Sequence, residues 1–423
     1  MARFFYNLIL FFLFPLVIAR LLVRSVRLPA YRQRIAERLA RFSAFKHDKP
    51  IIWVHAVSVG EVIAAVPLIK SLIKQYPDKQ LLVTTTTPTG SAQVLKLFSG
   101  QVLHVYAPYD LFWVVRRFIK RVKPCVLLVM ETEIWPNLYQ TCQDKNIPVI
   151  LANARMSEKS AVGYLRFSSL TRSTLRCISK IAVQGKGDAE RFIRLGAEEK
   201  QISITGSIKF DLELPNDLQK QAGLLRVELG VNRKIWIAAS THEGEEEILL
   251  NAYKQVSTVI DNLLLVLVPR HPDRFDRVAN SCERNNLKLV RRSEVKPCAS
   301  DTQVYLGDSM GELLLLYAVA DVAFIGGSLV PVGGHNLLEA AALAIPSVVG
   351  PEMFNFAEIT EQLLLCNGAM QVQDEKALAD AIEMLLSNDE LRKQLGANAH
   401  TFVEQNKGAL SELTNIVILI LNE

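Results

Sequence analysis

The chain has 423 residues, more than one hydrophobic core usually serves, so we expect two domains. Half of its residues are hydrophobic and 22% are charged, which excludes an intrinsically disordered chain. The formal net charge of +5 is too small for the strongly basic surface of a nucleic-acid-binding protein, so no nucleic-acid partner is expected.

The first predicted element is an apolar segment over residues 4–23, interrupted only by Asn7 and Arg20. Pro15 is expected to kink any helix there. The uninterrupted apolar part, residues 8–19, is shorter than the roughly 20 residues of a full membrane span, which favours a membrane anchor. No small-residue cleavage site precedes the basic stretch, which argues against a cleaved signal peptide.

A basic stretch follows the apolar segment, with a single acidic residue, Glu37, among seven arginines: Arg20, Arg24, Arg27, Arg32, Arg34, Arg38 and Arg41. A basic segment beside an apolar one is typical of contact with anionic lipid head groups. A solvated helix face is the alternative, but it requires no apolar neighbour. Because positive charge stays on the cytoplasmic side, the rest of the chain is predicted to be cytoplasmic.

Short apolar runs rich in β-branched residues come next, separated by helical patterns such as residues 61–76. The runs are residues 51–58, 81–87, 102–108, 126–132, 149–154, 181–184 and 202–206. Continuous apolar runs are typical of parallel strands that are buried on both faces. Strands alternating with helices predict a doubly wound α/β sheet.

A polar segment, residues 211–221, is interpreted as a linker before a second series of the same kind. Its runs are residues 235–240, 263–269, 287–292, 303–307, 322–328, 346–351 and 370–373. The sequence therefore predicts two α/β sheets with a cleft between them. Ligands of such sheets bind beyond the carboxyl ends of the strands, so the loops after these runs should carry the chemistry.

The sequence contains no C-x-x-C pair. Its six cysteines are Cys125, Cys142, Cys177, Cys282, Cys298 and Cys366, and most of them lie within apolar runs. This spacing indicates neither a disulfide framework nor a zinc site. It agrees with a reducing compartment.

Three groups of polar residues follow runs of the first half. Glu61 opens a helix just after His55 and Ser58, where it could act as a general base; a capping carboxylate is the commoner use of that position. Glu131 and Glu133 follow a buried run. While the chain is extended they share one side. They could hold an acceptor hydroxyl or stabilise developing positive charge, and a salt bridge to a neighbouring loop is the structural alternative.

Lys209 follows the last run of the first half, within Gly206-Ser-Ile-Lys-Phe-Asp211. A lysine directly after a strand can meet a phosphate or carboxylate as a point charge. A solvated surface lysine is the alternative explanation.

The second half supplies candidate anion-binding groups. Arg270 ends a buried run and is a good phosphate ligand. Residues 326–339 are glycine-rich and lead into a helix, so their backbone N–H groups and the helix N-terminus predict an anion site. Glu339, inside that helix, could accept hydrogen bonds from ribose hydroxyls.

The ordered set of motifs resembles that of the lipid A Kdo transferases, which move 3-deoxy-D-manno-octulosonic acid (Kdo) from CMP-Kdo onto a lipid A precursor. The resemblance covers nearly the whole chain. It rests on H-A-V-S-V-G-E (55–61), T-T-T-P-T-G (85–90), M-E-T-E-I-W-P-N (130–137), N-A-R (153–155), G-S-I-K-F-D (206–211), P-R-H (269–271), G-D-S-M-G-E (307–312) and G-G-H-N-L-L-E (333–339).

The resemblance implies the GT-B arrangement of two Rossmann-like domains facing a cleft. It implies a membrane anchor at 1–28, an acceptor-binding domain at 29–210 and a nucleotide-binding domain at 211–423, whose last helix can pack back on the first domain. It also implies inversion at the anomeric carbon with Glu61 as general base and with Glu131 and Lys209 stabilising the transition state.

The residues that the resemblance assigns to CMP are Pro269, Arg270, Met310, Gly311, Glu312, Asn336, Leu337, Leu338 and Glu339. No metal and no other cofactor is expected, because a nucleoside monophosphate leaving group can be stabilised by cationic side chains. The expected partners are CMP-Kdo, a lipid A precursor and an anionic membrane surface. The expected location is the cytoplasmic side of a bacterial inner membrane.

Three alternatives stay open from the sequence. Residues 112–123 are either a second basic, amphipathic membrane contact or an ordinary domain helix. The enzyme could instead be another GT-B transferase that uses a UDP-sugar on a lipid acceptor. A non-catalytic membrane scaffold would leave the acids and cations after the strands unexplained.

Overall fold

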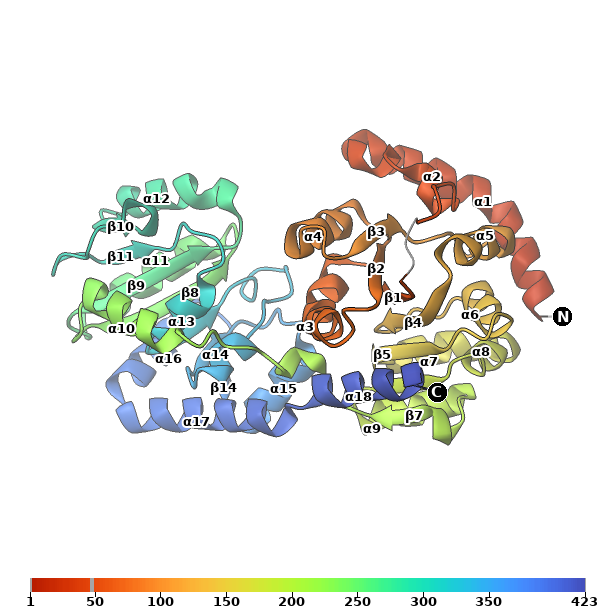
Figure 1. The fold of residues 1–423 in the computed structure, drawn as a ribbon. Helices are drawn as coiled ribbons and strands as arrows, with labels where there is room; N and C mark the ends of the chain where they lie inside the picture. The colour runs from red at the N-terminus through yellow and green to blue at the C-terminus, as the bar shows by residue number, and fades with distance from the viewer. Residues whose placement is uncertain (1, 46–48, 423) are drawn as a thin grey trace. The chain divides into compact units, whose positions relative to one another are not determined.

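The computed structural model describes residues 2–45 and 49–422 and divides the chain into two compact units (Figure 1). The N-terminal unit comprises residues 1–211 together with 407–423, and the C-terminal unit comprises residues 212–406. Each unit contains one parallel sheet with helices on both faces, so the predicted α/β fold class is confirmed.

The sheet of the N-terminal unit has the strand order β3-β2-β1-β4-β5-β6-β7. Its strands are β1 (Ile51–His55), β2 (Gln80–Thr85), β3 (Leu103–Tyr106), β4 (Pro124–Met130), β5 (Val149–Ala154), β6 (Lys180–Val183) and β7 (Ile202–Ile204). The strand order reverses between β1 and β4, and ligands of doubly wound sheets bind at such a point.

The N-terminal unit begins with the long helix α1 (Ala2–Arg27) and ends with α18 (Ala409–Asn422). The other helices are η1 (Pro29–Arg32), α2 (Ile35–Arg38), α3 (Val59–Gln75), α4 (Pro88–Phe98), α5 (Phe112–Val122), α6 (Pro136–Gln143), α7 (Glu158–Leu165), α8 (Ser168–Leu175), α9 (Lys186–Leu195), η2 (Glu199–Gln201) and η3 (Ile208–Phe210).

Both faces of this sheet are buried under helices. Ile51 and Trp53 of β1 pack into the apolar cluster on one face, while Ile52 and Val54 pack into the cluster on the other. This explains why the strand sequences are continuously apolar. The helix α18 contributes Leu413 and Val417 to the second cluster, and the Asp211 carboxylate accepts hydrogen bonds from Gly408 N (2.7 Å) and Leu410 N (2.8 Å).

The sheet of the C-terminal unit has the order β10-β11-β9-β8-β12-β13-β14. Its strands are β8 (Lys234–Thr241), β9 (Leu263–Pro269), β10 (Leu289–Arg291), β11 (Val304–Leu306), β12 (Val322–Ile325), β13 (Ser347–Val349) and β14 (Ala369–Gln371). Here the order reverses between β8 and β12, which directs attention to the loops that follow these two strands.

The helices of the C-terminal unit cover this sheet. They are α10 (Leu218–Leu229), α11 (Glu245–Val256), η4 (Pro272–Arg274), α12 (Phe275–Arg284), η5 (Arg292–Glu294), α13 (Leu313–Ala318), α14 (Leu338–Ala342), α15 (Ala357–Leu365), α16 (Glu375–Ser387) and α17 (Asp389–Asn406).

Several local predictions need correction. Each predicted apolar run overlaps a strand, but the first strand ends at His55 rather than Ser58. The predicted linker is shorter, because α10 begins at Leu218 and buries that side chain. Pro15 lies inside α1, and the kink expected there stays a prediction. All six cysteines are free thiols, as predicted.

Candidate active site

The Glu61 carboxylate lies at the start of α3 and is held by a local set of hydrogen bonds. Ser58 is the N-cap: its Oγ accepts from Glu61 N (3.3 Å) and donates to Glu61 Oε1 (2.9 Å). Val57 N donates to Glu61 Oε2 (2.8 Å). Glu61 is therefore the N3 residue of α3, with its carboxylate held by the N-cap hydroxyl and by the N–H group just before the cap, as well as a candidate base.

The environment of Glu61 raises the pKa of its carboxyl group to about 7. The main cause is burial, since the residue is only 8% exposed, and the negative charges of Glu131 and Glu133 add to it. The hydrogen bonds from Val57 and Ser58 act in the opposite direction. Among the described residues, no lysine or arginine forms an ion pair with Glu61, so its carboxylate keeps its capacity to accept a proton.

The acidic pair after β4 lies in the electrostatic range of Glu61, at the reversal of the strand order. Burial raises the pKa of Glu133, whose carboxylate accepts a hydrogen bond from Trp135 Nε1 (2.8 Å). The prediction that Glu131 and Glu133 share one side of an extended chain is wrong. The strand β4 ends at Met130, and Glu131 has a left-handed backbone with φ of 55°.

His55, at the end of β1, is not a hydrogen-bond partner of Glu61. Its Nδ1 lies 2.9 Å from Thr84 Oγ1, which also accepts a hydrogen bond from Trp53 Nε1 (2.8 Å). Burial lowers the pKa of His55 to about 4, so the imidazole is neutral. Its ring packs edge-on against Trp135 (centroids 4.8 Å apart), which connects β1 to the acidic loop.

Lys209 lies in η3, directly after β7. The position of η3 is fixed from β5, because Asn153 Oδ1 accepts a hydrogen bond from Ile208 N (3.2 Å). Asn153 has a left-handed φ of 55°, and so both β4 and β5 of this sheet end next to an unusual backbone conformation. Such conformations cluster at functional sites.

In the C-terminal unit, Arg270 follows β9 and its side chain is exposed. Three histidines lie near Arg270. His242 and His271 follow strands, and His335 lies within the glycine-rich segment. The rings of His242 and His335 are stacked, with centroids 5.0 Å apart, and one Nε2–H donates to the other Nε2 at 2.7 Å. The ring of His271 is 5.6 Å from that of His242.

The pKa of His335 is lowered to about 4, mainly by burial and also by the positive charge of Arg270. Burial lowers the pKa of His242 as well, so both rings of the pair are neutral. The motifs P-R-H (269–271) and G-G-H-N-L-L-E (333–339) contain His271 and His335, but no role was predicted for these histidines or for His242. Their signal was their position, because His242 and His271 come directly after buried strands.

Met310, Gly311 and Glu312 form a loop before α13. Gly311 has a φ of 90°, which glycine adopts without strain, and Met310 is 59% exposed. The Glu312 carboxylate accepts hydrogen bonds from Arg292 Nη2 (2.8 Å) and Nε (3.2 Å), which lowers its pKa. Since Arg292 already binds this carboxylate, the loop backbone is the better candidate for contact with a nucleotide.

The glycine-rich segment differs from the prediction of a free backbone anion site. Gly327 N, Ser328 N and Leu329 N donate to the Glu245 carboxylate at 2.7, 3.0 and 3.1 Å. His242 N donates to it as well (2.9 Å), and Glu245 is fully buried. An internal carboxylate thus occupies the anion position that the N–H groups of this turn create.

The last part of the segment leads into α14. Leu337 and Leu338 have fully buried side chains, so only their backbone atoms can contact a ligand. Asn336 Nδ2 donates to Glu339 Oε1 (3.2 Å), and Asn336 Oδ1 accepts from Leu338 N (3.1 Å). Burial raises the pKa of Glu339, and the charge of Arg270 acts in the opposite direction. Arg270, the histidines and Glu339 therefore form one polar cluster at the carboxyl ends of the strands.

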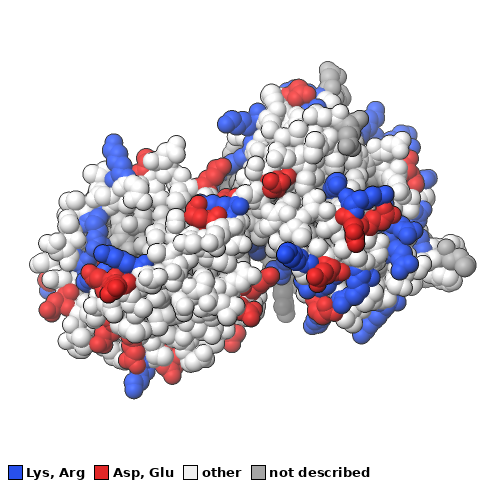
Figure 2. All heavy atoms as spheres, turned by 90° about the horizontal axis from the view of Figure 1, so that it is seen from below, with Lys and Arg blue, Asp and Glu red and all other residues white. Residues whose placement is uncertain are grey.

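The described part of the chain contains no group of three or more His, Cys, Asp or Glu side chains arranged to hold a metal ion. The surface drawn in Figure 2 carries basic and acidic side chains side by side in both units, in keeping with the modest net charge.

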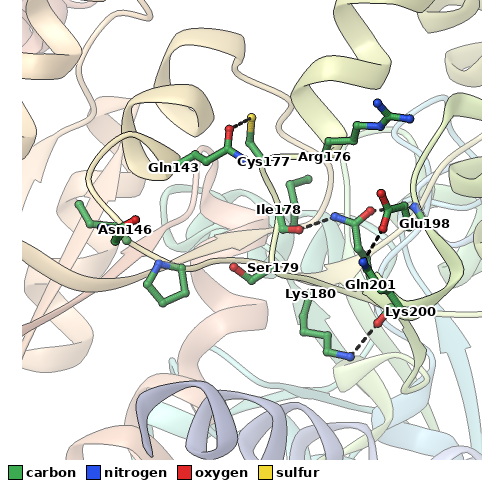
Figure 3. A pocket seen from close by; sticks show the side chains of 12 residues that line it. Gln143, Asn146, Arg176, Cys177, Ile178, Ser179, Lys180, Glu198, Lys200 and Gln201 are labelled. Atoms are coloured by element: carbon green, nitrogen blue, oxygen red, sulfur yellow. Dashed lines mark hydrogen bonds and ion pairs between the residues drawn. The ribbon is translucent and has the colours of Figure 1, made fainter. Parts of the chain in front are cut away.

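A cavity of about 770 Å³ lies in the N-terminal unit (Figure 3), and neither Glu61, Glu131 nor Glu133 lines it. The segments that precede β5, β6 and β7 line it, so it is at the amino ends of these strands. Lys180 Nζ donates to Lys200 O (2.9 Å), and Cys177 Sγ donates to Gln143 Oε1 (3.2 Å). Because Glu61 and Glu131 follow the carboxyl ends of their strands, this cavity is not part of the acidic site.

The comparisons with known proteins first define the class. A family model described as "Glycosyl transferases group 1" matches residues 238–402, and one described as "3-Deoxy-D-manno-octulosonic-acid transferase (kdotransferase)" matches residues 33–212. With two parallel-sheet units of the GT-B kind, the protein is a glycosyltransferase.

The particular family follows from full-length similarity. The chain is 42% identical over 419 residues to the 3-deoxy-D-manno-octulosonic acid transferase of Haemophilus influenzae, covering 99% of this chain and 98% of that one. It belongs to the 3-deoxy-D-manno-octulosonic acid transferase family.

Two solved structures are similar to it. The C-terminal CMP-Kdo binding domain of WaaA from Acinetobacter baumannii is 42% identical, with a TM-score of 0.43; the match covers 44% of this chain and 98% of that one. UDP-GlcNAc 2-epimerase from Neisseria meningitidis is 13% identical, with a TM-score of 0.57; the match covers 88% and 99% and shows a shared fold.

Proposed function

We propose that this protein transfers Kdo from CMP-Kdo to a lipid A precursor in lipopolysaccharide biosynthesis, with inversion at the anomeric carbon and without a metal ion. The N-terminal unit would bind the acceptor and the C-terminal unit would bind the donor. Membership of the Kdo transferase family supports Kdo as the sugar that is transferred. The positions of Glu61, Glu131, Lys209 and Arg270 after strands support the roles proposed for them.

The observation that carries the proposal is the state of Glu61. Its carboxyl group is buried, has a pKa of about 7, and has hydrogen-bond partners but no cationic partner among the described residues. A general base works best when its pKa is near the operating pH. A helix-capping carboxyl group acts in its ionised form, which the helix dipole stabilises. A raised pKa favours the protonated form, so helix capping alone does not account for it.

The proposed step balances as follows. An acceptor hydroxyl gives its proton to the Glu61 carboxylate while its oxygen forms a bond to the anomeric carbon of Kdo. The bond from that carbon to the phosphate oxygen breaks, and CMP leaves with the electron pair. Attack on the face opposite the leaving group inverts the configuration. Glu131 would stabilise positive charge on the sugar, and Lys209 negative charge on the departing phosphate.

The donor would be held by the cluster around Arg270. The guanidinium can bind phosphate oxygens, while the backbone of residues 310–312 and the polar atoms of Asn336 and Glu339 are available to the nucleoside. The neutral His242–His335 pair can take up a proton as negative charge enters beside it. Cationic groups of this kind can stabilise a departing monophosphate in place of a divalent ion.

We place the enzyme at the cytoplasmic side of a bacterial inner membrane. The helix α1 is long and apolar enough to cross a membrane, with a mean hydropathy of 2.2 in its apolar window. Exposed arginines lie in its last turns and after it, and an anionic surface would attract them: Arg20, Arg24, Arg32 and Arg41. Arg38 is buried and cannot take part. The acceptor is a membrane lipid, so attachment there would bring the protein to its substrate.

Purified protein incubated with CMP-Kdo and a tetraacylated lipid A precursor tests this proposal, with the products read by mass spectrometry. We expect mass increments of Kdo and release of CMP. Parallel incubations with UDP-sugars test the alternative donor class and should give no product. No sugar increment with CMP-Kdo, or an increment with a UDP-sugar alone, would overturn the proposal.

A further inference from the structure

The helix α1 contacts the N-terminal unit along one stripe over nearly its whole length. The residues of this stripe are less exposed than their neighbours and recur every three or four positions: Arg3, Tyr6, Asn7, Leu10, Phe14, Ile18, Leu21 and Ser25. This is the period of one helix face. Leu10 and Phe14 pack against the apolar cluster of the sheet, and Phe14 stacks edge-on against Tyr109 (centroids 5.6 Å apart). Figure 1 shows α1 running along the unit beside α5.

Two polar side chains of this stripe bind Asp110, in the loop before α5, and Asn137, in the first turn of α6. Tyr6 Oη donates to Asp110 Oδ2 (2.8 Å), and Asn137 Nδ2 donates to Asn7 Oδ1 (2.7 Å). We call Tyr6, Asn7, Asp110 and Asn137 the polar latch. Asp110 also accepts from Asn137 N (3.1 Å) and from Leu138 N (2.8 Å), so the same carboxylate caps the start of α6.

The outward side of α1 has the opposite character. Before Arg20, its well-exposed large side chains are all apolar: Phe4, Phe5, Leu8, Ile9, Phe11, Phe12, Leu13, Leu16 and Val17. A continuous apolar surface on a helix roughly 39 Å long, at 1.5 Å per residue, far exceeds the scattered apolar residues of ordinary surfaces. Before Arg20, the polar side chains Arg3, Tyr6 and Asn7 of α1 therefore face the protein, and most of its large apolar side chains face outward.

The side chains beside α1 and at its end are of the kinds that lie at the interface between the hydrocarbon of a bilayer and its head groups. Trp113 of α5 is 48% exposed and contacts Phe11 (centroids 6.3 Å apart). Exposed Arg20 and Arg24 lie at the end of α1, where they can reach anionic head groups. Tryptophan and arginine are the side chains that prefer the membrane interface.

A helix that left the protein to cross the bilayer would break the latch. Tyr6 and Asn7 would then lie in hydrocarbon without these partners, which is costly for polar groups. Asp110 and Asn137 would each lose one hydrogen bond and keep those that join them to each other. A helix docked along its length keeps these bonds and still places its apolar side in lipid. The contacts thus favour a helix that lies on the membrane over one that spans it.

We propose that α1 lies in the plane of an anionic bilayer, fixed to the N-terminal unit by the polar latch, and that the latch positions the acidic loop relative to the membrane. The connection is short, because α6 begins at Pro136, directly after Glu131, Glu133 and Trp135. The second part rests on the proposed function, since it assumes that this loop receives a lipid acceptor. Asp110 and Asn137 are then positioning residues rather than catalytic ones.

The orientation of α1 is tested with an epitope tag before residue 2 of the full chain. An in-plane helix keeps the tag on the cytoplasmic side, so protease should remove it in inverted membrane vesicles and not in spheroplasts. Removal of the tag in spheroplasts would show a spanning helix and overturn the proposal. This readout needs no enzymatic activity, so it stands even if the proposed reaction is wrong.

The latch is tested by the double substitution Tyr6→Phe and Asn7→Leu, which removes both hydrogen bonds and keeps the helix apolar. Phe12→Leu, on the outward side, is the matched control. Loss of two hydrogen bonds should lower the transfer rate about tenfold with acceptor in phosphatidylethanolamine–phosphatidylglycerol vesicles, and much less with detergent-dispersed acceptor. An equal fall with both acceptors, or no fall with either, would contradict a positioning role.

Discussion

At the scale of single residues, the raised pKa of Glu61 makes a prediction about pH. The carboxyl group is protonated below its pKa of about 7 and cannot accept the acceptor's proton there. The transfer rate should therefore rise with pH through about 7 and level off above it. The pH profile of kcat measures this, and a rate that is flat through the neutral range would contradict the assignment.

Ser58 gives a sharper version of this prediction. Its hydroxyl donates to Glu61 and lowers the pKa of that carboxyl group, so Ser58→Ala should move the acid limb of the pH profile to higher pH. Loss of the N-cap should also cost about 1 kcal/mol of stability.

Ser157→Ala is the matched control, because Ser157 caps α7 in the same way, accepting from Ser160 N. It should lower the melting temperature similarly and leave the acid limb in place. If both variants keep the wild-type pH profile, Ser58 does not set the basicity of Glu61.

Part of the site could be predicted from residue positions alone. Glu61, Glu131 and Arg270 were singled out because each follows a buried run, and the structure places each at a carboxyl end of a strand. Their roles stay predictions. The pairing of Glu245 with Gly327, Ser328 and Leu329 could not be predicted, because it joins segments more than 80 residues apart that meet only in the folded sheet.

At the scale of elements, the strands were predictable because both faces of each sheet are buried, which makes the strands continuously apolar. Element ends were less predictable. The acidic loop is an example: nothing in the sequence indicates that Glu131 adopts a left-handed backbone, which ends the alternation that the prediction assumed.

Two helical glycines, one in a close contact and one in open space, test how closely the helices pack. A Cβ at Gly396 would lie 2.0 Å from the backbone oxygen of Ala344, so Gly396→Ala should overpack this contact and cost about 1–3 kcal/mol. Gly223 in α10 has open space, so Gly223→Ala should instead stabilise the protein by about 0.5–1 kcal/mol. Thermal unfolding of both variants measures this, and equal effects would contradict the packing account.

At the scale of the whole molecule, the division into two parallel-sheet units follows from two series of apolar runs separated by a polar segment. The sequence could not indicate that α1 is docked by Asp110, because the latch joins residues more than 100 positions apart. Long-range hydrogen bonds of this kind leave no periodic signal, whereas sheets and helices do.

Metal independence is also a prediction about the whole enzyme. Arg270 and Lys209 supply positive charge that can stabilise a departing monophosphate. Preincubation with EDTA should therefore leave the transfer rate unchanged, and added Mg²⁺ should not raise it. Loss of activity that Mg²⁺ or Mn²⁺ restores would show that the reaction requires a metal ion.

The most direct test of the catalytic account is the transfer rate of Glu61→Gln with CMP-Kdo and a tetraacylated lipid A precursor. Glutamine keeps the size and one acceptor oxygen of the side chain but cannot take up the hydroxyl proton. The rate should fall about 10²–10⁴-fold, with CMP affinity and melting temperature near those of the wild type. Glu158→Gln, at an exposed position in α7, should change nothing. A Glu61→Gln enzyme with the wild-type rate would contradict the account.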